Sequence, residues 1–214
     1  CDFVNVHAYG AWPPSQIKYY DHSAEGMGFA VGEFGARSHP SMAGGGWGWS
    51  PEPETRRQFL RLPNITLGGT GSLVCSWDWK DMESCIFPWG LVYPCDLTPK
   101  GQFYAYRAAS HVLSQVRLDY ADPRVYVLVA DMNELGTRDP QNWQPALRCI
   151  DMLLRCGVPF GVLHDTNLTK LPAAARLVFY PCPFTMTDDT HARLEEFVRK
   201  GGILYVSGEV SYDE

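Results

Sequence analysis

The sequence lacks the features of nucleic-acid-binding and membrane-spanning proteins. Its 214 residues carry 18 basic and 24 acidic side chains, a formal net charge of -6, and Lys and Arg are scattered without runs. Because nucleic-acid-binding surfaces concentrate positive charge, this pattern argues against a nucleic-acid partner. No apolar run approaches the roughly 20 residues that cross a bilayer, and the start "CDFVNVHAYG" has no basic, signal-like region. We therefore expect neither nucleic acid nor a membrane as a partner.

Cysteine is present, but without the spacing of a metal site or a disulfide framework. There is no C-x-x-C pair and no His-x-x-x-His, and the seven cysteines stand at positions 1, 75, 85, 95, 149, 156 and 182. Zinc sites need closely spaced ligands, and a disulfide framework pairs an even number of thiols. We expect no metal site, and free thiols in a reducing cytoplasm rather than secretion. The sequons at Asn64 and Asn167 point the other way.

Phosphate-binding loops for a nucleotide or flavin cofactor are also missing. The "GGTG" at residues 68–71 precedes a predicted strand rather than a helix, and no Lys-Ser or Lys-Thr follows it. The "VADMNELG" at residues 129–136 has no hydroxyl-rich cradle, and its acidic side chains would repel a phosphate. We expect no cofactor.

The sequence divides into two parts that differ in the length of their predicted loops, and they meet near "LDYADPR" at residues 118–124. We expect a first domain over residues 1–119, where aromatic and Gly/Pro-rich loops are long. A second domain is expected over residues 120–214, where short strands and helices alternate and the C-terminus is truncated. The chain does not begin with Met, which favours an excerpt of a longer protein.

The first part predicts repeated units of strand, loop and helix. The segments "DFVNVHAY", "GFAVGE" and "GSLVCSW" read as strands, and apolar residues at helical spacing predict a helix from Pro99 that Thr98 caps. This order implies a parallel sheet, and the long loops favour a (β/α)8 TIM barrel with its active face at the carboxyl ends of the strands. Because eight units usually take about 250 residues, residues 1–119 are expected to form the C-terminal part of a barrel.

The second part predicts a flavodoxin-like α/β domain. Four apolar segments read as strands: "RVYVLVAD", "PFGVLHD", "ARLVFYP" and "GGILYVSG". Between them lie a helix that ends at Gly157 and a helix over residues 188–200, for which Thr187 is a suitable N-cap. Strands that alternate with helices in this way form an open, three-layer sheet.

Polar and aromatic residues follow the three predicted strands of the first part. Glu33 ends the second strand, His7 and Tyr9 end the first, and Trp77 ends the third. The carboxyl ends of barrel strands converge on one face, so these side chains are expected to line one site. A carboxylate attacks an anomeric carbon, phenol and imidazole groups orient it, and an indole stacks on a sugar ring. The pattern predicts a retaining glycosidase with Glu33 as its nucleophile.

These segments also resemble a known family. "NVHAYG", "AVGEFG" and the run from "SWDWKDME" to "PWGLVYPCDLTPKGQFYAYR" are similar to the sixth, seventh and eighth strand regions of clan A glycoside hydrolases, namely family 42 β-galactosidases and family 5 enzymes. The end "RLEEFVRKGGILYVSGEVSYDE" resembles the amidotransferase-like trimerisation domain that follows the barrel in family 42. The resemblance implies a carbohydrate substrate and a homo-oligomer, for which a trimer is one candidate form.

The resemblance also implies roles for individual residues. Glu33 would be the nucleophile, Tyr9 would hydrogen-bond it, Trp77 would line the subsite of the cleaved sugar, and His7 would contact the substrate. The general acid/base Glu would lie on the fourth strand, upstream of this chain. A retaining enzyme needs both carboxyl groups, so we expect this segment alone to be inactive on unactivated glycosides. The sugar and its linkage depend on strands that the sequence does not include.

Other interpretations remain open for each of these residues. Glu33 is either catalytic or a charge at a solvent-exposed strand end, and Trp77 is either a sugar platform or a packing group. Trp47, in the loop "SMAGGGWGWSPEPE", either covers a sugar or packs on the barrel rim. "DWKDME" reads as a solvated turn with a Lys80 salt bridge, and Cys182 as a buried structural thiol. The alternatives to a glycosidase are a non-catalytic carbohydrate-binding module and an oligomerisation module.

Overall fold

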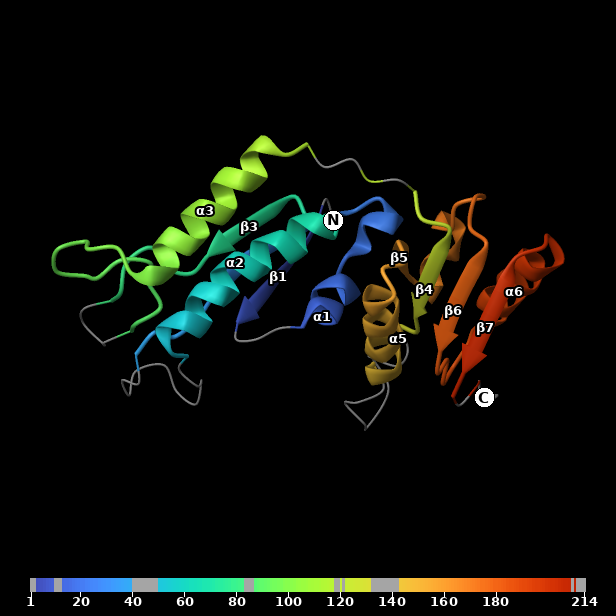
Figure 1. Cartoon of the computed structure of the whole chain (residues 1–214). Coiled ribbons are helices and arrows are strands. Elements are labelled where there is room, and N and C mark those ends of the chain that lie inside the picture. The colour runs from blue at the N-terminus through green and yellow to red at the C-terminus, as the bar shows by residue number, and fades with distance from the viewer. Residues whose placement is uncertain are drawn as a thin grey trace. The chain divides into compact units, whose positions relative to one another are not determined.

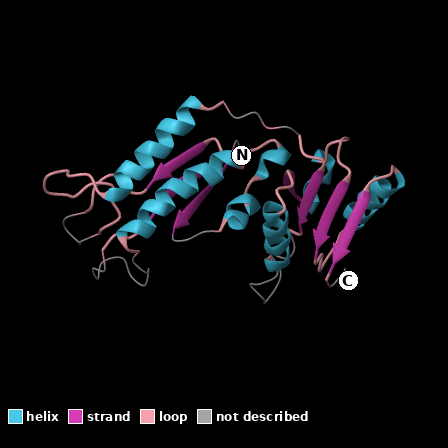
Figure 2. Ribbon diagram, viewed as in Figure 1, coloured by secondary structure: helices cyan, strands magenta, loops and turns pink. Residues whose placement is uncertain are grey.

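The computed structural model is a mixed α/β structure that contains two parallel sheets, each with its own helices (Figures 1 and 2). It describes residues 3–9, 13–39, 50–82, 87–117, 120, 122–131, 143–208 and 210. The chain forms two compact units. The first comprises Cys1–Pro13 and Gly28–Asp119, and the second comprises Pro14–Met27 and Tyr120–Glu214. Within the described ranges, no helix is both long and apolar enough to span a membrane.

The described residues of the first unit form three parallel strands in the order β1-β2-β3. Strands β1 (Phe3–Tyr9), β2 (Gly28–Gly35) and β3 (Leu73–Ser76) confirm the three predicted strands. Helix α2 (Glu52–Gly68) follows β2, and helix α3 (Gly101–Gln115) follows β3.

Helices α2 and α3 both pack on one aromatic residue of the central strand β2. The ring of Phe34 lies 4.8 Å from that of Phe59 on α2 and 5.5 Å from that of Tyr106 on α3. The Tyr106 hydroxyl also donates a hydrogen bond to the Val74 carbonyl of β3 at 2.7 Å. Helices α2 and α3 therefore hold the central strand in place next to Glu33.

The predicted N-cap of α3 is wrong. The helix begins at Gly101, and Thr98 lies before it in a turn where its amide donates to the Asp96 side chain at 2.9 Å. This turn is held by backbone pairing, because Tyr93 N donates to Thr98 O and Lys100 N donates to Leu91 O. A nearby pairing that the local sequence does not reveal thus displaces the helix start.

In the second unit, the part that the structure describes forms four parallel strands in the order β5-β4-β6-β7. They are β4 (Val125–Val129), β5 (Phe160–His164), β6 (Leu177–Pro181) and β7 (Ile203–Ser207), in agreement with the four predicted strands.

Among the described residues after β4, the second unit contains helices α5 (Gln144–Arg155) and α6 (Asp188–Arg199), and the 3-10 helix η2 (Asp165–Lys170) follows β5. Thr187 caps α6 as predicted, because its side chain accepts a hydrogen bond from Thr190 N.

Alternate residues of β4 supply two cores on opposite faces of this sheet. Val127 and Val129 pack in the cluster that contains α5, whereas Tyr126 and Leu128 pack in the cluster that contains α6. Successive side chains of a strand point to opposite faces. This strand, which is apolar at every position, is therefore buried on both faces.

The segment Pro14–Met27 packs with the second unit, although the expected boundary at residues 119 and 120 assigned it to the first. It contains helix α1 (Pro14–Tyr19) and the 3-10 helix η1 (His22–Glu25). Glu25 anchors it, because its carboxylate accepts from the backbone N–H of His164 at 2.6 Å and from Asn167 Nδ2 at 2.9 Å. The connection between β1 and β2 is thus part of the second compact unit.

We expect Glu25→Ala to expose the backbone around His164. The substitution removes the acceptor of a part-buried N–H group, and a buried group left without its partner costs roughly 1 to 3 kcal/mol. Amide exchange at His164, measured by NMR, should therefore rise by roughly ten- to a hundredfold. Glu25→Gln keeps a carbonyl acceptor and should have a smaller effect, and Glu195→Ala on the exposed face of α6 should have none. Unchanged exchange in Glu25→Ala would show that this anchor does not hold the segment.

Candidate functional site

Glu33 lies near the carboxyl end of β2, next to an irregularity in the pairing with β1. Val6 pairs with Val31, but His7 pairs with Glu33, so Gly32 is an extra residue in β2. A Cβ atom at Gly32 would lie 2.2 Å from Asn5 Oδ1, which explains why glycine suits this position. Such bulges redirect side chains and are common beside active sites. The bulge brings the Glu33 position directly opposite His7.

Two side chains of β1 contact the same oxygen of Glu33. The Tyr9 hydroxyl donates to Oε2 at 2.5 Å, and His7 Nδ1 lies 3.1 Å from that oxygen. Within the described part of the chain, Oε1 of Glu33 accepts no hydrogen bond, and 29% of the side chain is exposed. The structure thus brings together three predicted site residues, and both contacts to Glu33 fall on one oxygen of a part-exposed carboxylate.

The Tyr9 phenol is held in its neutral, hydrogen-donating form. Burial raises its pKa well above the ordinary value, and the hydrogen bond and negative charge of Glu33 raise it further, as does the charge of Asp78. An anion next to an acid disfavours loss of its proton. Tyr9 therefore remains a donor to Glu33 at any pH near neutrality.

Trp77 follows β3 and is tied by its backbone to the strand that carries Glu33. Its N–H donates to the Phe34 carbonyl at 2.7 Å, and its own carbonyl lies so close to Gly35 that a Cβ there would be only 2.3 Å away. The residue is 37% exposed, so its ring is not enclosed in the core. Trp47, the remaining predicted residue, lies outside the described residues.

Trp89 is a neighbour of the site that the sequence did not single out. It is buried, and its ring meets the Tyr9 ring edge-on at 5.2 Å. Its only sequence signal is the tripeptide "PWG". Because Trp89 is 56 residues away along the chain from Glu33 by their numbers, no local periodicity connects the two.

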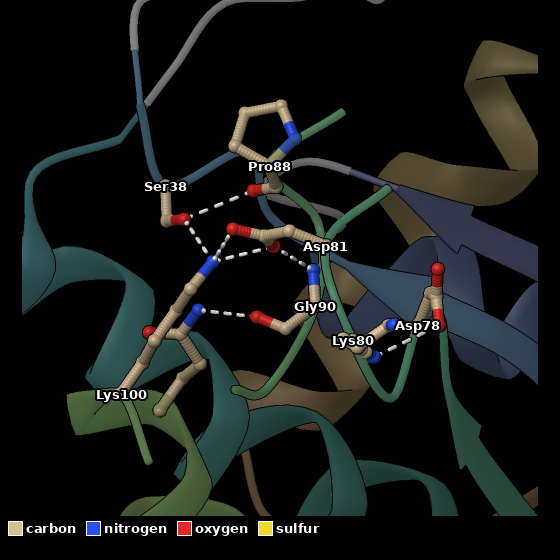
Figure 3. Close-up of polar contacts among 8 residues, drawn as sticks. Ser38, Asp78, Lys80, Asp81, Pro88, Gly90 and Lys100 are labelled. Carbon is tan, nitrogen blue, oxygen red and sulfur yellow. Dashed lines mark hydrogen bonds and ion pairs between the residues drawn. The ribbon is translucent and has the colours of Figure 1, made fainter. Parts of the chain in front are cut away.

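The segment "DWKDME" is not the solvated turn that its charges suggested. Asp81 is buried and pairs with Lys100, whose Nζ lies 2.6 Å from Asp81 Oδ1 (Figure 3). Lys80 is exposed, and its backbone N–H donates to the Asp78 side chain. Four charges in six residues look solvated, but the folded loop buries one of them opposite a distant lysine.

The arrangement at Glu33 suits nucleophilic chemistry. One carboxylate oxygen is held by two neighbours on β1, and the other accepts no hydrogen bond from the described residues. A carboxylate held in this way is able to attack an electrophilic carbon without first reorganising, which lowers the entropic part of the barrier.

Comparisons with known proteins find similarity of structure only. No protein-family model and no curated protein sequence matches the chain. A β-galactosidase from Bacillus circulans sp. alkalophilus is 16% identical over 96% of this chain and 32% of its own, with a TM-score of 0.71. A catalytic mutant of a GH42 β-galactosidase from G. stearothermophilus is 14% identical over 99% of this chain and 34% of its own, also at 0.71.

An exo-β-1,4-mannosidase from Opitutaceae bacterium strain TAV5 is 16% identical over 96% of this chain and 40% of its own, with a TM-score of 0.67. The chain therefore spans less than half the length of each of these structures. The likeness shows that the chain shares its fold with part of these glycoside hydrolases.

The raised pKa of Tyr9 predicts a pH-dependent contribution to stability. A folded-state pKa above the unfolded value gives a stabilisation that is complete below about pH 10, the ordinary tyrosine value, and is lost as pH rises toward the folded pKa. The difference in free energy of unfolding between the wild type and Tyr9→Phe, measured with urea, should therefore shrink between pH 8 and pH 11. A difference that is constant with pH would contradict the environment described for Tyr9.

Gly35→Ala should destabilise the strand end that carries Glu33. The new Cβ would clash with the backbone carbonyl of Trp77, and overpacking of this kind costs roughly 1 to 3 kcal/mol. Gly68→Ala is the matched control, because a Cβ at that last residue of α2 meets nothing within 4 Å. Urea unfolding that gives equal stabilities for the two variants would rule out the close approach at Gly35.

Proposed function

We propose that the chain is the C-terminal part of a retaining glycoside hydrolase of the β-galactosidase-like type, with Glu33 as its nucleophile. The observation that carries the proposal is the asymmetry at Glu33, where Tyr9 and His7 both contact Oε2, whereas Oε1 accepts no hydrogen bond from the described residues. The position at a carboxyl strand end and the shared fold with part of two β-galactosidases and a mannosidase support it.

In this proposal the reaction is a double displacement. Oε1 of Glu33 attacks the anomeric carbon, the glycosidic bond breaks, and the leaving oxygen takes a proton from an acid/base Glu upstream of this chain. A water molecule, deprotonated by that same upstream residue, then breaks the glycosyl ester and restores the Glu33 carboxylate. Tyr9 holds Oε2 throughout, and the exposed ring of Trp77 offers a surface on which a sugar stacks.

The proposal extends to the second unit. We assign its parallel sheet, with helices on both faces, to a flavodoxin-like domain of the trimerisation type that follows a family 42 barrel. The matched structures cover both units, since 96% or more of this chain aligns with each of the three described above. The protein would then act as a homo-oligomer on a carbohydrate in the cytoplasm.

The test uses a substrate that needs no acid. In 2-deoxy-2-fluoro-β-glycosyl fluorides, fluoride departs without a proton, and the fluorine at carbon 2 slows hydrolysis of the ester that forms. We expect the galacto- or manno-configured compound to add one sugar to the chain, with mass spectrometry placing it on Glu33. Glu33→Gln should abolish the label, and Glu52→Gln, on the first turn of α2, should not.

Two results would count against this function, and a third would count against the position assigned to the acid. One is a label on another residue, and another is a folded chain that neither compound modifies. Turnover of an unactivated disaccharide by the chain alone would contradict the upstream position of the acid, because that reaction requires both carboxyl groups. Binding of sugar without any label would favour a carbohydrate-binding module instead.

A further inference from the structure

The first unit also contains a buried lysine, Lys100, whose ammonium group has a hydrogen-bond acceptor for each of its N–H donors. Only 5% of Lys100 is exposed, and its Nζ donates to both Asp81 oxygens, at 2.6 and 2.7 Å, and to Ser38 Oγ at 3.0 Å (Figure 3). An ammonium group has three N–H donors, so each of them has an acceptor. The ring of Tyr93 lies 5.2 Å away on a further side.

The two partners of Lys100 hold the backbone on either side of Trp89. Ser38 holds the residue before Trp89, since its Oγ and its N–H both donate to the Pro88 carbonyl, at 2.9 and 3.0 Å. Asp81 acts on the other side, since its Oδ1 accepts from Gly90 N at 2.8 Å (Figure 3). One ammonium group thus links the groups that fix both neighbours of Trp89.

Two further contacts leave little freedom in this tripeptide. The Gly90 carbonyl accepts from Gln102 Nε2 at 3.1 Å, and the Trp89 carbonyl accepts from Asp78 N at 3.3 Å. A Cβ atom at Gly90 would lie 2.3 Å from Asp81 N, so the two backbones are in direct contact. The Trp89 side chain therefore projects from a backbone whose position depends on the ion pair.

Trp89 connects this loop to the Glu33 carboxylate through Tyr9. Its buried ring packs edge-on against Tyr9, and Tyr9 donates to Glu33. We propose that Lys100 is a positioning residue for the Glu33 nucleophile, acting through Asp81 and Ser38 on Trp89 and through Trp89 on Tyr9. The role in catalysis rests on the function proposed above, whereas the mechanical link from Lys100 to Tyr9 does not.

A gain in stability does not by itself explain why Lys100 and Asp81 form a buried ion pair. Burial lowers the pKa of Lys100, and the hydrogen bond and charge of Asp81 oppose that shift. Because taking two charges out of water offsets most of their attraction, apolar replacements of buried ion pairs are often as stable. Directed hydrogen bonds, in contrast, fix a loop in one place, which an apolar pair does not do.

The experiment compares Lys100→Met with Lys200→Met. Lys200 also forms an ion pair, with Glu196 at 2.6 Å, but it lies on the exposed end of α6. The chain is labelled with 3-fluorotyrosine, and the Tyr9 signal among the eleven tyrosines is assigned by its loss in Tyr9→Phe. We expect Lys100→Met to shift or broaden the 19F resonance of Tyr9, and Lys200→Met to leave it unchanged.

The labelling reaction gives the second readout. Lys100→Met should slow covalent modification of Glu33 by the fluorosugar by roughly ten- to a hundredfold, with little change in the concentration that gives half the maximal rate. This split separates misplacement of the nucleophile from loss of sugar binding. A purely structural lysine would lower the urea midpoint without changing the labelling rate of the folded fraction.

A milder variant keeps the test informative if Lys100→Met does not fold. Ser38→Ala removes the hydroxyl tie to Pro88 and leaves the Asp81 pair in place, and it should displace the Tyr9 resonance in the same direction by less. An unchanged Tyr9 resonance in a folded variant of either kind overturns the proposal. If the wild type is never labelled but the resonance moves, the link from Lys100 to Tyr9 stands and the glycosidase function fails.

Discussion

The pairing of β1 with β2 across a single bulge is the constraint on which the candidate site depends. Because side chains alternate along a strand, His7 and Tyr9 share one face of β1, and the extra residue at Gly32 brings Glu33 opposite His7. A shift of one residue in this register would turn both β1 side chains to the other face. Helices α2 and α3, packed on Phe34, and the backbone of Trp77, bonded to the same strand, keep β2 in place.

The strands and the meeting of His7, Tyr9 and Glu33 were predictable from sequence because they depend on short-range rules. Alternation and apolar runs locate the strands, and the carboxyl ends of parallel strands meet at one edge. Trp89 and the Asp81–Lys100 pair were not predictable, because they depend on how the loop after β3 folds back on itself. Nor does any local pattern show that Pro14–Met27 packs with the second unit.

Errors at the level of single residues had a common cause. Thr98 has the chemistry of an N-cap, but backbone pairing of its turn places the helix start at Gly101. Asp81 belongs to a charged run that is typical of exposed turns, but Lys100 offers it a buried partner. In both cases a contact within the folded loop overrides the preference of the isolated segment.

The contrast between two glutamates separates an anchoring carboxylate from one suited to react. Only 2% of the Glu25 side chain is exposed, and each of its oxygens accepts from a donor of the same unit, so further binding would have to displace those donors. Glu33 is 29% exposed, and its two described contacts fall on one oxygen. A buried carboxylate with both oxygens engaged is held in place as an acceptor of hydrogen bonds. A part-exposed carboxylate with one oxygen held and the other without a described hydrogen bond is oriented but not fully engaged, and such a group suits nucleophilic attack better than a buried one.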